Sequence, residues 1–220
     1  METETQLSER RRYRKRKRAL SELETRQRIT QAAVALHQTV GPARTSVKAI
    51  AERAGVDRAT VYRHFPDEQA LFDACTSHYY TRHPMPNPEQ WAEITRPEER
   101  LRTALAELYA WYAETEQMLH AGIRDIDHVP AKSREAFFGY FEAVHAALMT
   151  GRHERGRPRV RVSAAIAHAI NFHTWRSLVR EQQLSADEVI TLITAMVQTA
   201  AHPTPDPSRQ TQSTTLRPRT

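Results

Sequence analysis

The chain has 220 residues, of which 40% are hydrophobic and 26% charged, as in a globular protein long enough to bury its own core. A single cysteine, Cys75, excludes an intramolecular disulfide and a multi-cysteine zinc site. The formal net charge of +6 favours an anionic partner, nucleic acid or membrane, but the charge is uneven. Residues 1–20 carry eight basic and three acidic groups, whereas residues 21–75 carry seven of each.

Both ends of the chain have the composition of disordered segments. Residues 10–18 are almost entirely Arg and Lys, and residues 201–220 are rich in Pro, Ser, Thr and Gln. We therefore expect a disordered basic arm at 1–20 and a disordered tail at 201–220. No stretch approaches the ~20 apolar residues of a membrane helix, and no apolar segment follows Arg18 to form a signal peptide. The expected location is cytoplasmic, on the nucleoid, with no membrane partner.

Helical periodicity runs from residue 21 to about 75. The first helix is expected to begin after Ser21, because Ser21 and Glu24 have the spacing of a capping box, and to stop at Gly41. Three further helices are each expected to open on a polar N-cap residue: Ser46, Asp57 and Asp67.

The second half also reads as helices, ending with one capped by Ser185 and Glu188. In the segment 160–180, apolar side chains fall on two faces of a single expected helix. Such a helix must be covered on both sides, so a second subunit is the expected cover. No segment shows sustained strand alternation, and the fold class is therefore all-α.

Residues 46–65 have the pattern of a helix-turn-helix. Gly55 gives conformational freedom at the turn, and Val61 and Phe65 mark the inner face of the second helix. Its outer face carries Arg58 and Thr60 near the N-terminus, where a guanidinium and a hydroxyl can read bases in a major groove.

Several short motifs carry a family resemblance over about residues 22–75. They are Thr25-Arg26-Gln27-Arg28-Ile29, Ala32-Ala33, Gly41, Thr45-Ser46, Ile50-Ala51, Ala54-Gly55-Val56 and Thr60-Val61-Tyr62-Arg63-His64-Phe65-Pro66-Asp67. This region resembles the N-terminal domain of TetR-type (TetR/AcrR) transcriptional regulators. The segment Thr174-Trp175-Arg176-Ser177-Leu178 is similar to an eighth-helix sequence common in that family.

The resemblance implies an all-α protein with two domains. An N-terminal three-helix helix-turn-helix DNA-binding domain would span residues 21–77, and a C-terminal helical ligand-binding and dimerisation domain would span 78–200. It implies a homodimer formed through the last two helices, a near-palindromic double-stranded DNA operator and a small-molecule effector bound within 95–180. The implied activity is that of a ligand-responsive regulator, a repressor released from its operator by the effector.

The resemblance also implies roles for individual residues. The positions expected at phosphates are Thr45, Ser46, Tyr62 and His64, and those expected near bases are Arg58, Ala59, Thr60 and Arg63. Many family members have a Lys at the start of the fourth helix that bonds a phosphate. Glu68 stands there in this chain, and Gln69 or the basic arm is the expected substitute.

Aromatic and histidine side chains of the second half are candidates for the effector pocket, although aromatic stripes also build ordinary cores. The candidate residues are Trp111, Tyr112, Phe137, Phe141, His145, His168, Phe172 and Trp175. The pair His168 and His173 lacks the i, i+4 spacing of metal ligands, so no metal or cofactor is expected.

Two other readings stay open from the sequence. The fold could serve a small-molecule-binding protein or an enzyme, although no nucleophile-elbow, dinucleotide or metalloprotease motif is present, and no catalytic residue is expected. Alternatively, the basic arm could drive sequence-tolerant DNA binding. Cys75 falls on an apolar face, which favours inert burial over redox sensing.

Overall fold

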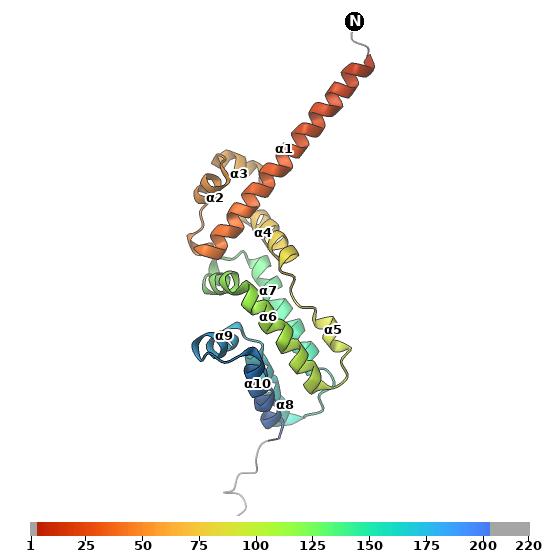
Figure 1. Cartoon of the computed structure of the whole chain (residues 1–220), viewed down its shortest axis with the longest axis vertical. Coiled ribbons are helices and arrows are strands. Elements are labelled where there is room, and N and C mark those ends of the chain that lie inside the picture. The colour runs from red at the N-terminus through yellow and green to blue at the C-terminus, as the bar shows by residue number, and fades with distance from the viewer. Residues whose placement is uncertain (1–3, 203–220) are drawn as a thin grey trace, which may run out of the picture. The chain divides into compact units, whose positions relative to one another are not determined.

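A computed structural model describes residues 4–202, and over this part of the chain all regular structure is helical (Figure 1). The α-helices are α1 (Glu4–Thr39), α2 (Val47–Ala54), α3 (Arg58–His64), α4 (Glu68–Arg82), α5 (Pro88–Ala92), α6 (Pro97–Arg124), α7 (Ala131–Met149), α8 (Gly156–Ala169), α9 (Phe172–Arg176) and α10 (Ala186–Ala201). Two short 3₁₀ helices, η1 (Pro42–Arg44) and η2 (Ile126–His128), and a π-helical turn, η3 (Ser177–Glu181), complete the described elements. The expected all-α fold class is confirmed.

The described chain forms two compact units, each built from two stretches of sequence. The first unit holds the residues up to Met85 together with Trp111–Tyr140, and the second holds Pro86–Ala110 together with the described residues from Phe141 onward. Helices α6 and α7 therefore contribute one part to each unit.

The first unit is built around α1, which packs against α2 and α4, while α2 packs against α3. Its core is made of small and branched side chains that let these short helices approach closely. Ile29, Ala33, Val61 and Phe65 are each at most 2% exposed. Burial of this core, at about 25 cal/mol per Å² of apolar surface, holds α1, α2, α3 and α4 together.

Polar caps define the short helices of the first unit as the sequence predicts. The Ser46 hydroxyl accepts a hydrogen bond from the N–H of Ala49, and the carboxylates of Asp57 and Asp67 accept from the third residue of α3 and α4. Gly55 ends α2 in the left-handed conformation, with φ of 65°. A residue with a Cβ is strained there, so glycine suits this turn.

The expected start of the first helix is wrong. Helix α1 begins at Glu4 rather than after Ser21, and it runs through the basic residues expected to form a disordered arm (Figure 1). Arg, Lys, Leu and Glu are good helix formers, and i, i+4 pairs such as Arg18 with Glu22 support the helix. Ser21 therefore lies inside α1 rather than at its N-terminus, so Ser21 and Glu24 form no capping box.

The second unit is centred on α8 and α10, which pack side by side. Trp91, Trp175 and Val144 are almost fully buried within it. Arg100, 2% exposed, donates hydrogen bonds to backbone carbonyls of Trp91 and Ile94 and to those of Ala147 and Thr150. This buried guanidinium thereby ties the start of α6 to the end of α7. The capping box of Ser185 and Glu188 at the start of α10 is confirmed.

The expected single helix over residues 160–180 is also wrong. Helix α8 ends at Ala169, Asn171 caps the short helix α9, and the chain continues into the π-helical turn. Because the chain turns at Asn171, Phe172 and Trp175 are buried within the unit, at 4% and 1% exposure. The two apolar faces are therefore covered inside one chain, and their pattern is no argument for a second subunit.

No helix within residues 4–202 is both long and apolar enough to cross a membrane. The expected disordered tail lies, from residue 203 on, outside the described residues.

Candidate nucleic-acid interface and ligand cavity

Helices α2 and α3 form a helix-turn-helix with one buried and one exposed face. On α3, Val61 is 1% exposed against the core, whereas the adjacent Tyr62 is 56% exposed. The cap at Asp57 and the tight turn at Gly55 fix where α3 begins. Its outer face and its N-terminal N–H groups are therefore presented together to solvent, as a major-groove reader requires.

The structure brings all eight sequence-predicted DNA contacts together on the segment 45–64. Exposed among them are Ser46, Arg58, Ala59, Tyr62 and Arg63, and half-buried are Thr45, Thr60 and His64. The Thr45 hydroxyl donates to the carbonyl of Gly41, which holds the approach to α2 in place. The guanidinium of Arg63 donates to the hydroxyl of Thr60 at 3.2 Å, so these two side chains share the surface of α3.

Arg26 of α1 fixes the C-terminal end of α3. Its guanidinium donates to the backbone carbonyl of His64 and stacks over the ring of Phe65 at 4.1 Å. Partial burial, together with the charges of Arg63 and Arg26, lowers the pKa of His64. His64 is therefore a neutral hydrogen-bonding group near pH 7 rather than a cation.

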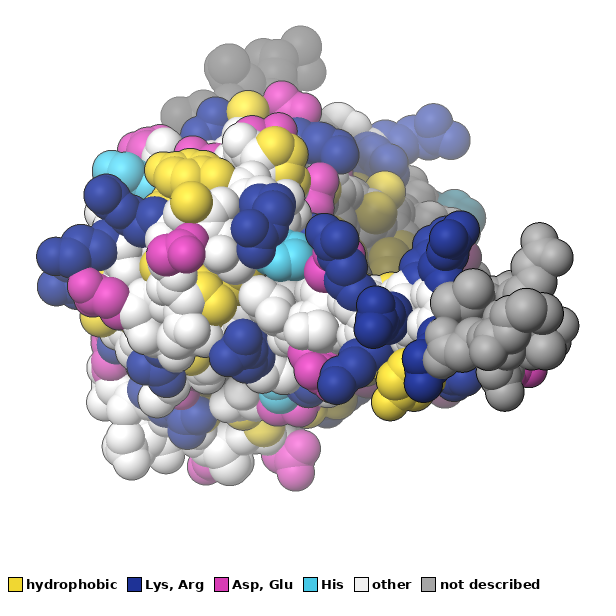
Figure 2. Space-filling model, turned by 90° about the horizontal axis from the view of Figure 1, so that it is seen from above, with side chains coloured by type: hydrophobic (Ala, Val, Ile, Leu, Met, Phe, Trp, Pro, Cys, Tyr) yellow, Lys and Arg dark blue, Asp and Glu magenta, His cyan; other side chains and the backbone are white. Residues whose placement is uncertain are grey.

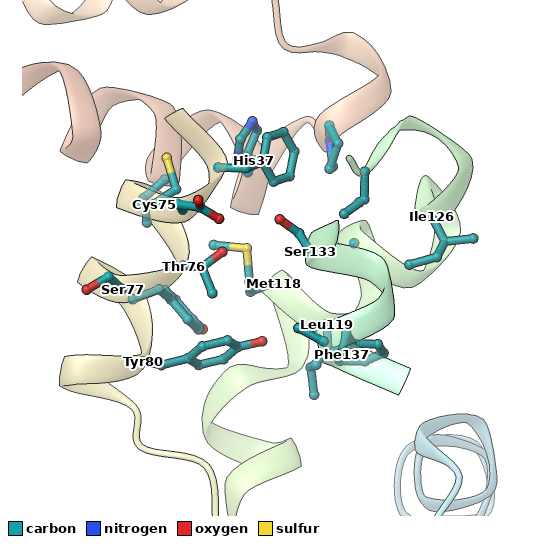
Figure 3. Close-up of a pocket in the computed structure, with 18 of the residues that line it drawn as sticks. His37, Cys75, Thr76, Ser77, Tyr80, Met118, Leu119, Ile126, Ser133 and Phe137 are labelled. Carbon is teal, nitrogen blue, oxygen red and sulfur yellow. The ribbon is translucent and has the colours of Figure 1, made fainter. Parts of the chain in front are cut away.

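A cavity of about 490 Å³ lies in the first unit, between α1, α4, the second half of α6 and the start of α7. Figure 3 shows side chains of these helices around it, with the Ser133 hydroxyl directed into the space. Its apolar wall includes Val34, Phe72, Met118, Leu119, Ile123, Ile126, Val129 and Phe137. This volume is in the usual range for small-molecule sites.

The titratable groups deepest in this wall are neutral near pH 7. Burial lowers the pKa of His37 to about 4 and raises the pKa of the Cys75 thiol to about 12. Burial also raises the pKa of the Tyr80 hydroxyl to about 12. Charged groups at the cavity are Asp73 and Lys132, which are exposed and pair at 3.5 Å. The cavity thus offers an apolar wall with a few uncharged donors and acceptors.

Residues 29–75 match the sequence profile of the bacterial regulatory proteins of the tetR family. This matched segment contains the helix-turn-helix described above. The chain carries a TetR-type DNA-binding domain. The match covers this domain and supports a DNA-binding transcriptional regulator.

Several solved structures have a similar fold. A TetR-like transcriptional regulator from Rhodococcus sp. RHA1 is 16% identical with a TM-score of 0.56, and the match covers 82% of this chain and 97% of that one. A Clostridium perfringens protein assigned as a fatty acid metabolism regulator is 17% identical, with a TM-score of 0.54 and coverage of 79% and 97%. A Mesorhizobium loti MAFF303099 protein assigned to the TetR family is 21% identical, with a TM-score of 0.50 and coverage of 81% and 96%. At these identities the likeness establishes the fold, and no curated protein matches the sequence.

The predicted effector residues are divided between the two units. Phe137 lines the cavity, while Trp111 and Tyr112 are buried beside each other in the same unit. The remaining five belong to the second unit: Phe141, His145, His168, Phe172 and Trp175. Phe172 and Trp175 pack in the core of that unit, His145 approaches Ser163, and His168 is exposed beside Thr174.

Sequence reasoning missed most of the cavity because its wall begins in α1 and α4. Periodicity places Cys75 on an apolar face, but it does not separate a cavity from a filled core. The expected effector region of 95–180 holds only part of the wall.

The side chain of Gln69, the second residue of α4, forms hydrogen bonds within the first unit. Its amide nitrogen donates to the carboxylate of Asp73 at 2.7 Å and to the hydroxyl of Ser133 at 2.9 Å. Gln69 thus connects α4 to α7, and Glu68 remains exposed at the first position of α4. Within residues 4–202, no group of three His, Cys, Asp or Glu side chains is placed to hold a metal ion.

Proposed function

We propose that this protein is a ligand-responsive repressor that reads a near-palindromic operator as a homodimer. The observation that carries the proposal is the capped, exposed α3, with Arg58, Thr60 and Tyr62 on its outer face. Arg58 and Thr60 would read base edges, with Ala59 and Arg63 beside them. Thr45, Ser46, Tyr62 and His64 would hold phosphates. The DNA-binding domain would span residues 21–77.

The proposed dimer would form through α8 and α10. Each of these helices exposes a large apolar side chain, Val160 at 56% and Leu192 at 51%. Burial of such side chains against a second copy would stabilise the dimer. Two copies of α3 would then reach successive major grooves about 34–36 Å apart, or slightly more.

The proposed effector is an uncharged, largely apolar small molecule bound in the 490 Å³ cavity. The neutral states of His37, Cys75 and Tyr80 support this class, because a buried ionic ligand would find no opposite charge deep in the wall. Residues of α1 and α4 line the cavity, and both helices pack within the unit that carries α3. An occupant would thus favour one arrangement of these helices over another and change operator affinity.

In vitro selection from a random duplex library, followed by footprinting, tests the proposal. The expected product is a short near-palindromic sequence, protected as one site and released by an apolar ligand. Repeated selection without any recurrent sequence would contradict operator reading. A recurrent site whose affinity no cavity-binding ligand changes would instead contradict ligand response.

A further inference from the structure

The projecting part of α1 carries the densest positive charge in the described chain. Residues 9–18 include eight basic side chains and one acidic side chain, and all ten residues are exposed. Figure 1 shows α1 continuing past α2 and α3, and in Figure 2 dark blue Lys and Arg side chains gather along it. At 1.5 Å per residue this stretch is about 15 Å long, so it can lie beside several DNA phosphates.

A groove runs between this part of α1 and the C-terminal end of α3. From α1 it is lined by Arg14, Lys17, Arg18, Ser21, Glu22 and Thr25. These positions are spaced by three and four residues, so they share one face of the helix. Arg63 and His64 of α3 form the other side, and we call this feature the α1–α3 groove.

The polar balance inside the α1–α3 groove favours an anion. The groove has one acidic side chain, Glu22, and that carboxylate already pairs with Arg18 at 3.1 Å. Arg14, Lys17 and Arg63 therefore provide the excess positive charge. Ser21 and Thr25 add hydroxyl groups of the kind that bond phosphate oxygens.

The walls of the groove are held in a fixed relation. Arg26 of α1 donates to the carbonyl of His64 and stacks on Phe65, which directly follows α3. Arg63 lines the groove and also lies on the exposed surface of α3. The groove is thus continuous with the surface that would enter the major groove.

We propose that the α1–α3 groove binds the DNA sugar-phosphate backbone beside the half-site read by α3, with Arg14 and Lys17 at phosphates. The inference rests on the proposed operator reading by α3 for its position on the DNA. It adds a sequence-independent contact to that reading, made by a helical segment that the base contacts do not involve.

The chemistry of the groove separates DNA from a membrane surface. None of its lining residues is apolar. The exposed large apolar side chains between residues 9 and 25 are Tyr13, Leu20 and Leu23, and at 100° per residue they lie about 100° to 180° around the helix from Arg14. A membrane-binding helix would instead insert that apolar side into the lipid surface.

A pair of double variants with equal charge tests the inference. Arg14→Gln with Lys17→Gln removes two cations from the groove, and Arg12→Gln with Arg16→Gln removes two from the other side of the same helix. Gln keeps the helix propensity near that of Arg and Lys, which circular dichroism can confirm. Each protein is titrated by fluorescence anisotropy with one arbitrary duplex of about 30 base pairs between about 50 and 200 mM salt.

The plot of log binding constant against log salt concentration should be less steep for the groove variant. Its slope should be smaller in magnitude by about 1.8, since each phosphate contact contributes about 0.9. The control variant should keep nearly the wild-type slope. Equal slopes for the two variants, or no change in either, would overturn the inference. The inference would also be contradicted if the groove variant bound this duplex like the wild type but no longer co-sedimented with vesicles of anionic phospholipid. The duplex is arbitrary, so this result is independent of whether selection recovers an operator.

Discussion

The carboxylate of Asp125, which directly follows α6, accepts a hydrogen bond from the backbone N–H of Ala43 at 3.1 Å, across 82 residues of sequence. Its neighbour Arg124 donates to the carbonyl of Val40 and to Asp125 itself. The hydrogen bonds from Arg124 lower the pKa of Asp125 to about 2. The loop that leads into α2 is therefore held by an ionised carboxylate at the end of α6, the helix that also lines the cavity.

Replacing Asp125 should loosen this loop. Asp125→Ala leaves the N–H of Ala43 and the guanidinium of Arg124 without their acceptor, so the free energy of unfolding should fall by about 1–3 kcal/mol. Urea denaturation measures the change. Asp127→Ala removes a nearby exposed carboxylate and should have a much smaller effect. Equal losses in the two variants would show that the contact with Ala43 adds nothing.

Gly41 is the position where this loop tolerates no side chain. Its φ is 89°, and a Cβ would clash with Nη2 of Arg124 and Oδ2 of Asp125. Gly41→Ala should therefore lower the melting temperature more than Gly151→Ala, where φ is 71° but nothing lies within 4 Å of the added Cβ. Strain of about 1–3 kcal/mol is common to both, and the clash is specific to Gly41. Similar shifts at the two sites would contradict the close approach of Arg124 and Asp125.

A side chain added at Gly122 would occupy part of the cavity. Gly122 lines the cavity and has nothing within 4 Å of an added Cβ, and the same is true of Gly139 on α7, which does not line it. Leu at either helical position should raise helix propensity by about 1 kcal/mol. Apolar compounds that raise the melting temperature of the wild type should still do so for Gly139→Leu but not for Gly122→Leu. Retained ligand shifts in Gly122→Leu would place the ligand elsewhere.

His37 should make stability depend on pH. It stacks on Phe72 with ring centroids 4.7 Å apart, and burial lowers its pKa from 6.5 to about 4. The unfolded state therefore binds more protons between these values, so stability is full above about pH 6.5 and falls as the pH drops toward 4. The full difference corresponds to about 3 kcal/mol.

Urea denaturation between pH 7 and 4.5 measures this dependence. His37→Gln should flatten the profile relative to the wild type, whereas His153→Gln, at an exposed histidine, should leave its slope unchanged. A wild-type slope retained in His37→Gln would assign the dependence to other groups.

Base reading by α3 gives a separate prediction. Arg58→Ala and Thr60→Ala should each reduce discrimination between the selected operator and a mismatched duplex, by about 1–3 kcal/mol where a bidentate contact is lost. Competition binding measures this ratio, and Arg102→Ala, at an exposed residue of α6, is the control. Wild-type discrimination in both α3 variants would show that another element reads the bases.

Local chemistry let the sequence predict much of the first unit. The caps at Ser46, Asp57 and Asp67 and the turn at Gly55 depend on residues only a few positions apart. The eight predicted DNA contacts fall on one segment of 20 residues, so their proximity follows from two short helices and the turn between them. The same local reasoning was wrong at Ser21, where the helix propensity of the preceding residues outweighs a capping-box pattern.

Contacts distant in sequence were decided only by the tertiary structure. The composition and uneven charge of the chain determined by themselves that its positive charge lies ahead of a nearly neutral helix-turn-helix. The sequence put Cys75 on an apolar face and made Phe137 a pocket candidate, but only the packing of α1, α4, α6 and α7 leaves a cavity beside them. Likewise, only the fold brings Asp125 to Ala43 and Arg14 to Arg63, because a helical pattern records which face is buried and not which partner it meets.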